Sequence, residues 1–180
     1  HKGLKRFVHV SSLAAYGPSR PGQPLRETDP RRPVEFYGES KLASERVVER
    51  AQVPYTIIRP SGVYGPRDVD MLELFKLARG RVNLFFGNRK SWGSFVYVDD
   101  VVSAILRAGA ATAAEGRGYF LADGEPITWE TLQADIMAVV GKRALTVSLP
   151  KQMPFVAGAL GELATRFDGE PRLMNRQKAI

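Results

Sequence analysis

Short apolar runs rich in β-branched residues alternate with amphipathic helical segments along this chain, and this alternation constrains its fold more than any other feature. The predicted strands are 7–11, 55–59, 95–98, 118–122 and 145–149. The predicted helices are 36–51, 71–79, a segment after Asp99, 129–140 and 151–167. Strands that alternate with helices in this way predict an α/β fold with a largely parallel sheet.

Four residues mark where the predicted helices begin and end. Asp99 and Thr128 are placed to cap the starts of two helices, since their side chains can accept a hydrogen bond from a free backbone N–H. Gly80 and Gly141 follow helix ends, where glycine readily adopts the left-handed conformation that terminates a helix.

The composition excludes several classes of site. The 180 residues include no cysteine, which rules out disulfides and thiolate chemistry, and only two histidines, so we predict no metal site. The net charge of +7 is compatible with an anionic partner, but the basic residues are scattered without interleaved aromatics, and we expect no nucleic-acid partner. A missing, more acidic part of the protein would also explain the charge. A cytoplasmic location fits the absence of cysteine.

No segment has the pattern of a membrane span or of a signal peptide. The longest apolar stretch near the end, 153–164, is short and contains Glu162, whereas about 20 apolar residues are needed to cross a bilayer. Lys2, Lys5 and Arg6 precede a strand-like run rather than the apolar core of a signal peptide. We therefore predict no integral membrane segment, while peripheral contact with a membrane stays open.

Two loops are the places where we expect chemistry, because parallel sheets bind ligands at the carboxyl ends of their strands. One loop follows Ser11 and the other follows Arg59. Between them, Tyr37 and Lys41 are four residues apart on a predicted helix and share one face. A nearby ammonium favours the phenolate, so we expect Lys41 to lower the pKa of Tyr37 from about 10 and make it a usable proton carrier. Taken alone, such a pair is more often a solvated helix face.

Four motifs, in this order, resemble the extended short-chain dehydrogenase/reductases, also described as the NAD-dependent epimerase/dehydratase family. They are Ser11-Ser12-Leu-Ala-Ala-Tyr-Gly, Tyr37-Gly-Glu-Ser-Lys41, Arg59-Pro-Ser-Gly-Val-Tyr-Gly-Pro66 and Phe95-Val-Tyr-Val-Asp-Asp-Val. The resemblance implies an α/β fold that is the C-terminal part of a Rossmann-like, doubly wound parallel sheet, with a small C-terminal substrate-binding subdomain. The incomplete Rossmann-like domain would occupy 1–110 and the substrate-binding portion 111–180, with an interleaved boundary.

The resemblance also implies an enzyme, an NAD(P)-dependent oxidoreductase that transfers hydride between nicotinamide and an alcohol or ketone. Ser12 would hydrogen-bond the reacting oxygen, Tyr37 would exchange a proton with it, and Lys41 would bind the nicotinamide ribose and hold the pKa of Tyr37 down. These three residues are the predicted catalytic set. The predicted cofactor-binding residues are Ser11, Tyr37, Lys41, Pro60, Ser61, Gly62 and Val63. The cofactor would be NAD or NADP, the partner a small-molecule substrate, and the assembly a homodimer formed through helices beside the site.

One motif of this superfamily is absent. The phosphate-binding sequence Gly-x-x-Gly-x-x-Gly does not occur in the 180 residues, and the residue that would distinguish NAD from NADP is missing with it. We therefore expect an N-terminally truncated fragment that has lost most of its affinity for a dinucleotide. A non-catalytic binding module that reuses the fold stays an alternative.

The substrate class depends on the segment before the fourth motif. Sugar-nucleotide epimerases and dehydratases of the family commonly have Arg-Asp where this chain has Gly93 and Ser94, and a guanidinium is the natural partner of a diphosphate. Arg89 and Lys90 are near enough in sequence to compensate. The form of the fourth motif and the tail 169–176 look more like the 3β-hydroxysteroid dehydrogenase and dihydroflavonol reductase branch. We therefore predict an apolar alcohol or ketone, with nucleotide-sugar epimerase or dehydratase activity as the alternative.

Other conspicuous side chains have simpler explanations. His9 lies inside a predicted strand and is expected to be structural. Asp99 and Asp100 fit the start of a helix better than a catalytic acid pair. Tyr16 and Tyr64 are equally compatible with packing and with substrate contact. The remaining candidates are Trp92 and Phe95, for which we favour packing, and 66–68, which we expect near the substrate.

Overall fold

The computed structural model describes residues 3–20, 22–80, 82–141 and 145–150, which belong to two compact units. The first unit comprises His1–Asp68 and Gly93–Pro126. The second comprises Val69–Trp92 and the chain from Ile127 onward. The sequence-based division is different: it assigns cofactor chemistry to residues 1–110 and substrate binding to residues 111–180. This functional division stays a prediction.

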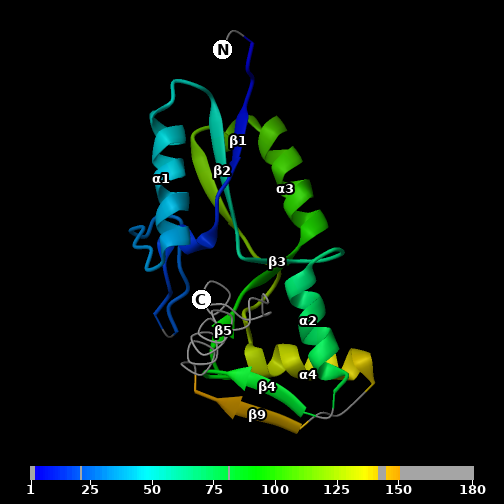
Figure 1. Ribbon diagram of the computed structural model, residues 1–180. Coiled ribbons are helices and arrows are strands. Elements are labelled where there is room, and N and C mark those ends of the chain that lie inside the picture. The colour runs from blue at the N-terminus through cyan, green and yellow to red at the C-terminus, as the bar shows by residue number, and fades with distance from the viewer. Residues whose placement is uncertain (1–2, 21, 81, 142–144, 151–180) are drawn as a thin grey trace, which may run out of the picture. The chain divides into compact units, whose positions relative to one another are not determined.

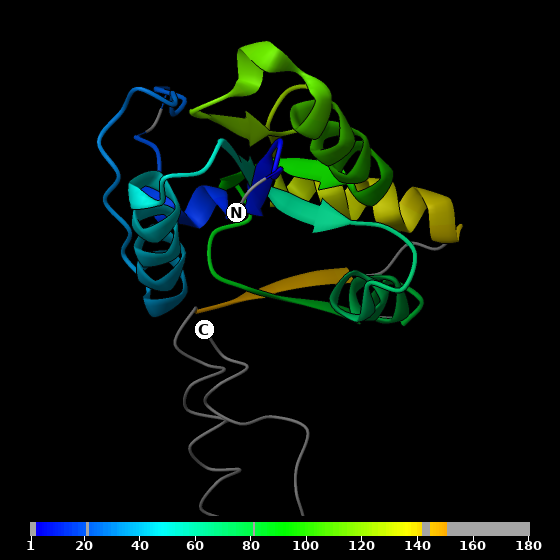
Figure 2. The same ribbon diagram turned by 90° about the horizontal axis from the view of Figure 1, so that it is seen from above.

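The first unit is built on a three-stranded sheet in which every pair of neighbours is parallel. The strand order is β1 (Phe7–Val10), β2 (Tyr55–Pro60), β7 (Arg117–Leu121). The helices α1 (Phe36–Arg50) and α3 (Val98–Ala110) lie on opposite sides of these strands (Figures 1 and 2). Residues 56–58 of the central strand β2 are all buried. A central strand covered on both faces explains why consecutive residues of β2 are buried, rather than every second residue.

The carboxyl ends of β1 and β2 meet at one edge of the sheet, where the predicted site lies. The Ser11 N–H donates to the carbonyl of Ile58 at 2.7 Å, and the Ser61 N–H donates to the carbonyl of Leu121 at 2.9 Å. After β1 the chain enters a single 3-10 turn, Leu13–Tyr16. The two loops that we selected from the sequence are therefore neighbours in the fold.

The segment after β2 is more regular than the loop that we expect from the sequence. β3 (Gly62–Tyr64) pairs in parallel with β6 (Phe95–Tyr97). Pro60 is the last residue of β2 rather than the residue that stops it. A proline is tolerated at this position because β1 ends at Val10, opposite Ile58, so the pairing of β2 with β1 needs no donor at Pro60.

The proline-rich segment 17–35 is tied to the sheet by hydrogen bonds. The hydroxyl of Tyr16 donates to the backbone carbonyl of Glu27 at 2.9 Å, and the Arg32 N–H donates to the carbonyl of Tyr16 at 3.1 Å. The carboxylate of Glu27 accepts from the N–H of Phe120 in β7 at 3.1 Å. A side chain of this segment thus satisfies a backbone donor of the sheet.

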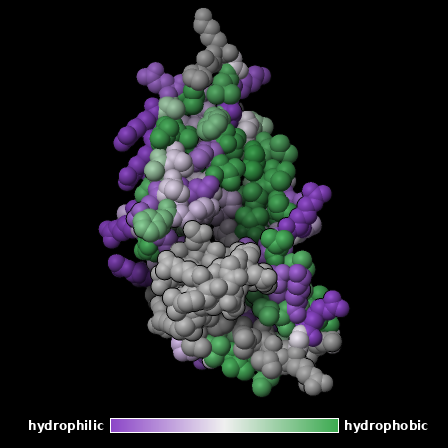
Figure 3. Space-filling view, in the orientation of Figure 1, coloured by the Kyte–Doolittle hydropathy of each residue, from purple (hydrophilic) through white to green (hydrophobic). Residues whose placement is uncertain are grey.

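The surface of the first unit is apolar around α3 and β1, whereas purple, hydrophilic side chains gather along α1 (Figure 3). The exposed apolar side chains include Phe7 and Val10 in β1 and Val102 and Leu106 in α3. A further short element of this unit, the 3-10 turn Thr112–Ala114, precedes β7.

The second unit combines two helices with short strands. Its elements are α2 (Val69–Ala78), β4 (Val82–Phe86), β5 (Trp92–Gly93, whose glycine belongs to the first unit), β8 (Ile127–Thr128), α4 (Trp129–Val140) and β9 (Leu145–Leu149). β4 and β9 pair in parallel, and α2 packs against both α4 and β4. The rings of Phe85 and Trp129 lie 6.3 Å apart between centroids and join β4 to α4.

The structure confirms the predicted α/β class with a parallel sheet, and it confirms both predicted ends of α4. The Thr128 hydroxyl caps α4 by accepting from the Thr131 N–H at 3.1 Å, and Gly141 ends α4 in the left-handed conformation with φ of 68°. The prediction that Asp99 caps α3 is wrong, because Val98 is already helical and the cap position is Tyr97. Asp99 and Asp100 instead occupy the first turn, where their charge favours the positive end of the helix dipole.

Two further elements differ from the sequence-based expectations. β4 is a strand that we do not predict, and its partner β9 lies far along the chain. The predicted helix 151–167 and the tail 169–176 lie outside the described residues. Within the described ranges, no helix is both long enough and apolar enough to cross a membrane.

Candidate active site

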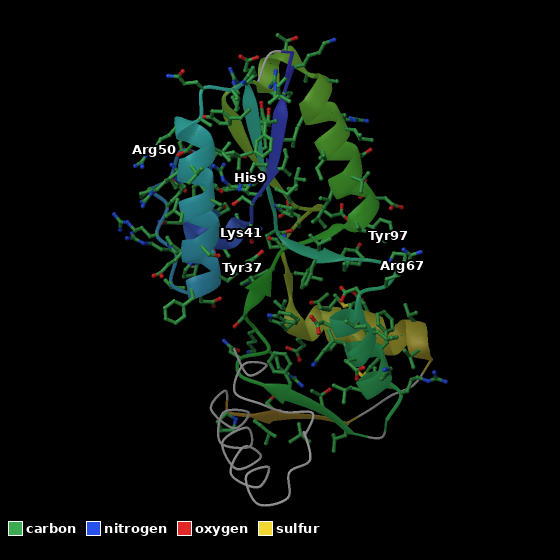
Figure 4. All side chains as sticks on the ribbon, turned by 45° about the horizontal axis from the view of Figure 1, so that its top comes forward. His9, Tyr37, Lys41, Arg50, Arg67 and Tyr97 are labelled. Carbon is green, nitrogen blue, oxygen red and sulfur yellow. The ribbon has the colours of Figure 1, made fainter. Side chains whose placement is uncertain are left out.

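Tyr37 and Lys41 lie on the side of α1 that faces β1 (Figure 4). The ammonium of Lys41 is 5.7 Å from the centre of the Tyr37 ring. The same ammonium donates a hydrogen bond to the carbonyl of Val10 at 3.3 Å. Val10 is the last residue of β1 and directly precedes Ser11 and Ser12. Lys41 thus joins the helix that carries Tyr37 to the strand that leads to the predicted catalytic serine.

Ser12 caps the 3-10 turn that follows β1. Its Oγ accepts a hydrogen bond from the N–H of Ala14 at 3.2 Å. That bond uses the oxygen as an acceptor, so the hydroxyl proton is still available to be donated to a ligand. The structural role that a loop serine ordinarily has and the predicted catalytic role are therefore compatible in this residue.

Gly38, next to Tyr37, allows the first turn of α1 to lie directly against the 3-10 turn. A Cβ built at position 38 would collide with the backbone carbonyl oxygen of Ala14 and would lie 3.0 Å from the Cβ of Pro33. A backbone oxygen cannot move aside as the end of a flexible side chain can. Gly38 therefore sets how closely the helix of Tyr37 approaches the turn that Ser12 caps, and we did not single it out from the sequence.

We expect Gly38→Ala to lower the free energy of unfolding by about 1–3 kcal/mol, the range for overpacking a tight contact. Gly109→Ala is the matched control, because a Cβ there has only Val8 Cγ2 nearby, at 3.7 Å. Alanine is the better helix former, so this change in α3 should raise the stability by about 0.5–1 kcal/mol. Urea unfolding of both variants makes the comparison. An equal effect of the two substitutions would contradict the proposed close contact.

The predicted cofactor segment 60–63 leaves β2 and enters β3. The hydroxyl of Ser61 is buried and has no hydrogen-bond partner within the described part of the chain. The backbone N–H of Gly62 donates to the carbonyl of Ser94 at 3.1 Å, and the ring of Phe95 packs where a side chain at position 62 would be. The absence of a side chain at Gly62 thus makes room for the ring of Phe95. The predicted close approach of the Gly62 backbone to a nicotinamide stays a prediction.

The structure brings one group of the predicted site residues together and leads the other away from it. Ser11, Ser12 and Lys41 gather at the end of β1, and Tyr37 lies beside Lys41. Pro60 and Ser61 lie at the end of the adjacent strand. Gly62 and Val63 continue into the pairing with β6. The first group supplies an ammonium, a phenol and hydroxyls, and the buried unpartnered hydroxyl of Ser61 adds another. Together these groups can donate and accept several hydrogen bonds to a polar ligand.

Arg59 and Glu45 form a buried ion pair behind the site, and neither was singled out as a functional residue from the sequence. The Glu45 side chain is fully buried, and Arg59 in β2 donates to both of its carboxylate oxygens, at 2.8 and 3.0 Å. Burial opposes the ionisation of Glu45, but the Arg59 guanidinium, the Ser11 hydroxyl and the Arg31 guanidinium together outweigh it and hold the pKa of this carboxyl below its ordinary value. The available signal was spacing, because Glu45 comes one helical turn after Lys41.

The structure shows the surroundings of three aromatic side chains that were considered from the sequence. Tyr16 packs: its ring lies 5.0 Å from the Arg59 guanidinium and 4.7 Å from the Phe120 ring, and burial raises the pKa of its hydroxyl. Tyr64 forms an edge contact with Tyr97, 5.5 Å between ring centres. The expectation that Trp92 packs is wrong, because its side chain is 70% exposed.

His9 and the 66–68 segment have different surroundings. The Nε2 of His9 is 3.0 Å from the hydroxyl of Ser44 on α1, and burial together with the charge of Lys41 lowers the pKa of the imidazole. His9 therefore joins β1 to α1, in agreement with a structural role. Arg67 is exposed and has a positive φ of 75°, which is uncommon for a residue other than glycine. Its predicted contact with substrate stays a prediction.

Comparison with known proteins identifies the family of this chain. A family model described as the NAD dependent epimerase/dehydratase family matches residues 1–122. The chain belongs to this epimerase/dehydratase family. The resemblance inferred from the four motifs is therefore confirmed, and the described sheet with its flanking helices is the Rossmann-like architecture of the family.

Individual members of the epimerase/dehydratase family differ in the reactions for which they are named. UDP-glucose 4-epimerase of Mycolicibacterium smegmatis is 29% identical over 172 residues, 89% of this chain and 52% of that protein. The decarboxylating sterol-4-alpha-carboxylate 3-dehydrogenase of Bos taurus is 29% identical over 130 residues, 66% of this chain and 36% of that protein. A crystal structure of the UDP-glucose 4-epimerase of Thermus thermophilus, a complex with NAD, is 25% identical, with a TM-score of 0.70 over 82% of this chain and 52% of that one. The chain therefore spans about half the length, or less, of these relatives.

Proposed function

We propose that this chain supplies the catalytic part of an NAD(P)-dependent oxidoreductase that transfers hydride between a nicotinamide and an alcohol or ketone. One observation carries the proposal: the ammonium of Lys41 lies beside the Tyr37 ring and is hydrogen-bonded to the end of the strand that leads to Ser12. Membership of a family described as NAD dependent supports the choice of cofactor. Both NAD and NADP are proposed as the cofactor.

In the proposed mechanism, side chains of this chain bind the substrate oxygen and transfer the proton. The hydroxyl of Ser12 donates a hydrogen bond to the reacting oxygen of the substrate. The hydroxyl of Tyr37 exchanges a proton with the same oxygen, giving it up during reduction of a ketone and taking it back during oxidation of an alcohol. The positive charge of Lys41 stabilises the phenolate that Tyr37 becomes when it gives up the proton. A bound nicotinamide supplies or accepts the hydride.

Residues near the same edge of the sheet are proposed to hold the nicotinamide end of the cofactor. Lys41 would bind the ribose hydroxyls, with Tyr37 beside it. Ser11, Pro60, Ser61, Gly62 and Val63 would line the ring. The buried Ser61 hydroxyl supports this part of the proposal, because a buried polar group without a partner is destabilising unless a ligand satisfies it.

For the substrate we propose an apolar alcohol or ketone. A guanidinium for a diphosphate is absent at Gly93, and a Cβ there would lie 3.2 Å from the ring of Phe95. Arg89 is already in an ion pair with Glu130 at 2.7 Å. The ion pair of Arg89 weakens one of the two compensations, by Arg89 or by Lys90, that a sugar-nucleotide substrate would need. The similarity to a sterol dehydrogenase agrees with an apolar substrate.

Nucleotide-sugar epimerase or dehydratase activity is the second candidate function. Its support is the M. smegmatis UDP-glucose 4-epimerase, which matches 89% of this chain. Epimerisation would use the same Tyr37 and Lys41 and would differ in the ligand bound. Saturation-transfer NMR with UDP and with a steroid ketone separates the two, because only a nucleotide-sugar enzyme is expected to bind UDP.

We also propose a cytoplasmic location and a homodimer. The absence of cysteine supports the first. The second is supported by exposed apolar side chains on and just before α1, namely Phe36, Val47 and Val34.

The test of the proposed function is binding of the nicotinamide end by itself. Reduced nicotinamide mononucleotide lacks the adenosine half, so it needs no contribution from the absent glycine-rich motif. We expect Lys41→Met to weaken its binding about tenfold, equivalent to about 1.4 kcal/mol. Lys76→Met is the control, because Lys76 lies on α2 and pairs only with Glu73 in the described structure. Binding is measured by saturation-transfer NMR. Equal binding of the mononucleotide by wild type and Lys41→Met would refute the assignment of Lys41 to the nicotinamide ribose.

A further inference from the structure

The ion pair between Glu45 and Arg59 joins the two segments that carry the candidate site. Glu45 is on the same helical ridge as Tyr37 and Lys41, two turns and one turn further along α1. Arg59 directly precedes the segment 60–63 in β2. The pair therefore links the helix of the catalytic residues to the strand that leads into the cofactor segment.

The geometry of this pair allows little movement of either partner. Two parallel hydrogen bonds join the guanidinium to the carboxylate, and the Glu45 side chain is completely buried. A planar fork of donors matches a carboxylate in only one relative orientation. The ring of Tyr16 lies over the guanidinium, and a Cβ at Gly118 would collide with its nitrogens. The glycine thus makes the room that Arg59 fills.

A third cation extends the connection to the segment 17–35. Arg31 donates to Glu45 at 2.8 Å and to Glu49, one turn further along α1, at 2.7 Å. Unlike Arg59, Arg31 is about a quarter exposed, and Glu49 is similarly exposed. We can therefore test two ion pairs separately: the outer pair of Arg31 and Glu49, and the inner pair of Glu45 and Arg59.

We propose that Glu45 and Arg59 are positioning residues that set the place of α1 along β2, and so the place of Tyr37 and Lys41 against segment 60–63. The proposal rests on the proposed function of that site. Apolar contacts between a helix and a sheet are not directional and tolerate small shifts along the helix axis. A buried ion pair is seldom more stabilising than apolar residues of the same volume. In this chain, the contribution of the ion pair between Glu45 and Arg59 is to define one position of α1 along β2.

Hydrogen–deuterium exchange of the 180-residue chain without cofactor tests the proposal. In Glu45→Gln, we expect the amides of residues 40–44 and of Ser61 and Gly62 to exchange about tenfold faster through local opening. The amides of β1 should exchange as in wild type. Glu49→Gln is the matched control on the same helix, since it loses the outer ion pair and keeps the inner ion pair. Should Glu45→Gln fail to fold, Arg59→Lys, which keeps the charge and loses one hydrogen bond, gives the same comparison.

The double variant Glu45→Met with Arg59→Met separates positioning from stability. We expect it to recover the unfolding free energy that the single variant loses, while the fast local exchange persists. Three results would overturn the proposal: recovery of both properties in the double variant, equally fast exchange in Glu49→Gln, or acceleration spread evenly over all strands. None of these measurements involves hydride transfer, so a failure of the proposed function would appear separately in nucleotide binding and turnover.

Discussion

Replacing Tyr37 with phenylalanine is expected to lower turnover by about 10²- to 10⁴-fold, the contribution of one positioned acid–base side chain. The substitution removes only the hydroxyl that exchanges a proton with the substrate oxygen in the proposed mechanism. The Tyr37 side chain is 55% exposed, so the loss of its oxygen should leave the stability of the fold unchanged. The measurement is the rate of nicotinamide oxidation with a ketone that the wild-type protein reduces, taken at saturating substrate.

Tyr119→Phe provides the control for this result. Tyr119 is a partly buried tyrosine of β7, outside the set of predicted site residues. Its variant should retain turnover within about twofold, as expected for a substitution that leaves the transition state untouched. Wild-type turnover by Tyr37→Phe would exclude Tyr37 as the proton carrier. A fall in thermal stability of the same variant would show that the lost activity came from the fold instead.

Arg59→Met is expected to lower the free energy of unfolding by about 3–5 kcal/mol at neutral pH, because it leaves the buried carboxylate of Glu45 without its main partner. Lys76→Met breaks the exposed pair of Lys76 with Glu73, whose side chains are more than half exposed. Exposed pairs contribute about 0–1 kcal/mol, so this control should change little. Urea unfolding at neutral pH compares the two. Similar losses of unfolding free energy in the two variants would show that the buried pair contributes no more to stability than an exposed pair.

The same pair predicts how stability depends on pH. The pKa of Glu45 is lower in the folded chain than its ordinary value of 4.5. The unfolded chain therefore binds this proton more readily, and the stability that Glu45 contributes is present above about pH 4.5 and is lost as the pH falls through the folded pKa. The difference in unfolding free energy between wild type and Arg59→Met should accordingly shrink in acid. A difference that is constant from neutral pH to about pH 3 would contradict this account.

Local patterns in the sequence were sufficient for most elements of the first unit. The strands at 7–11 and 55–59 and the helix at 36–51 agree with the structure within one residue at each end. β4 was missed although its residues Val82–Phe86 are mostly of the branched and aromatic types that favour strands, and although its partner β9 was predicted. The cap of α3 was misplaced by two residues because an aspartate is favoured both at a cap and in the first helical turn.

The candidate site shows the same division between local and long-range information. Tyr37 and Lys41 could be selected because a spacing of four places two side chains on one helix face, and the order of the motifs named the family. Sequence could not select Glu45 and Arg59 as a pair, since they come from different elements and meet only when α1 packs on β2. Gly38 was missed for a similar reason, as its importance depends on the carbonyl of Ala14 in another element.

By itself, then, the sequence determined the order of the main strands and helices of the first unit, the parallel α/β class and the family. It also determined the identity of the chemical groups, because each of these depends on residues close together along the chain or on motifs that can be compared. Only the tertiary structure decided that Lys41 is held by the carbonyl of Val10, that Tyr16 is a packing residue and that a buried ion pair lies behind the site. Hydrogen bonds, burial and close packing depend on distances in space, and those distances exist only once the helices lie against the sheet.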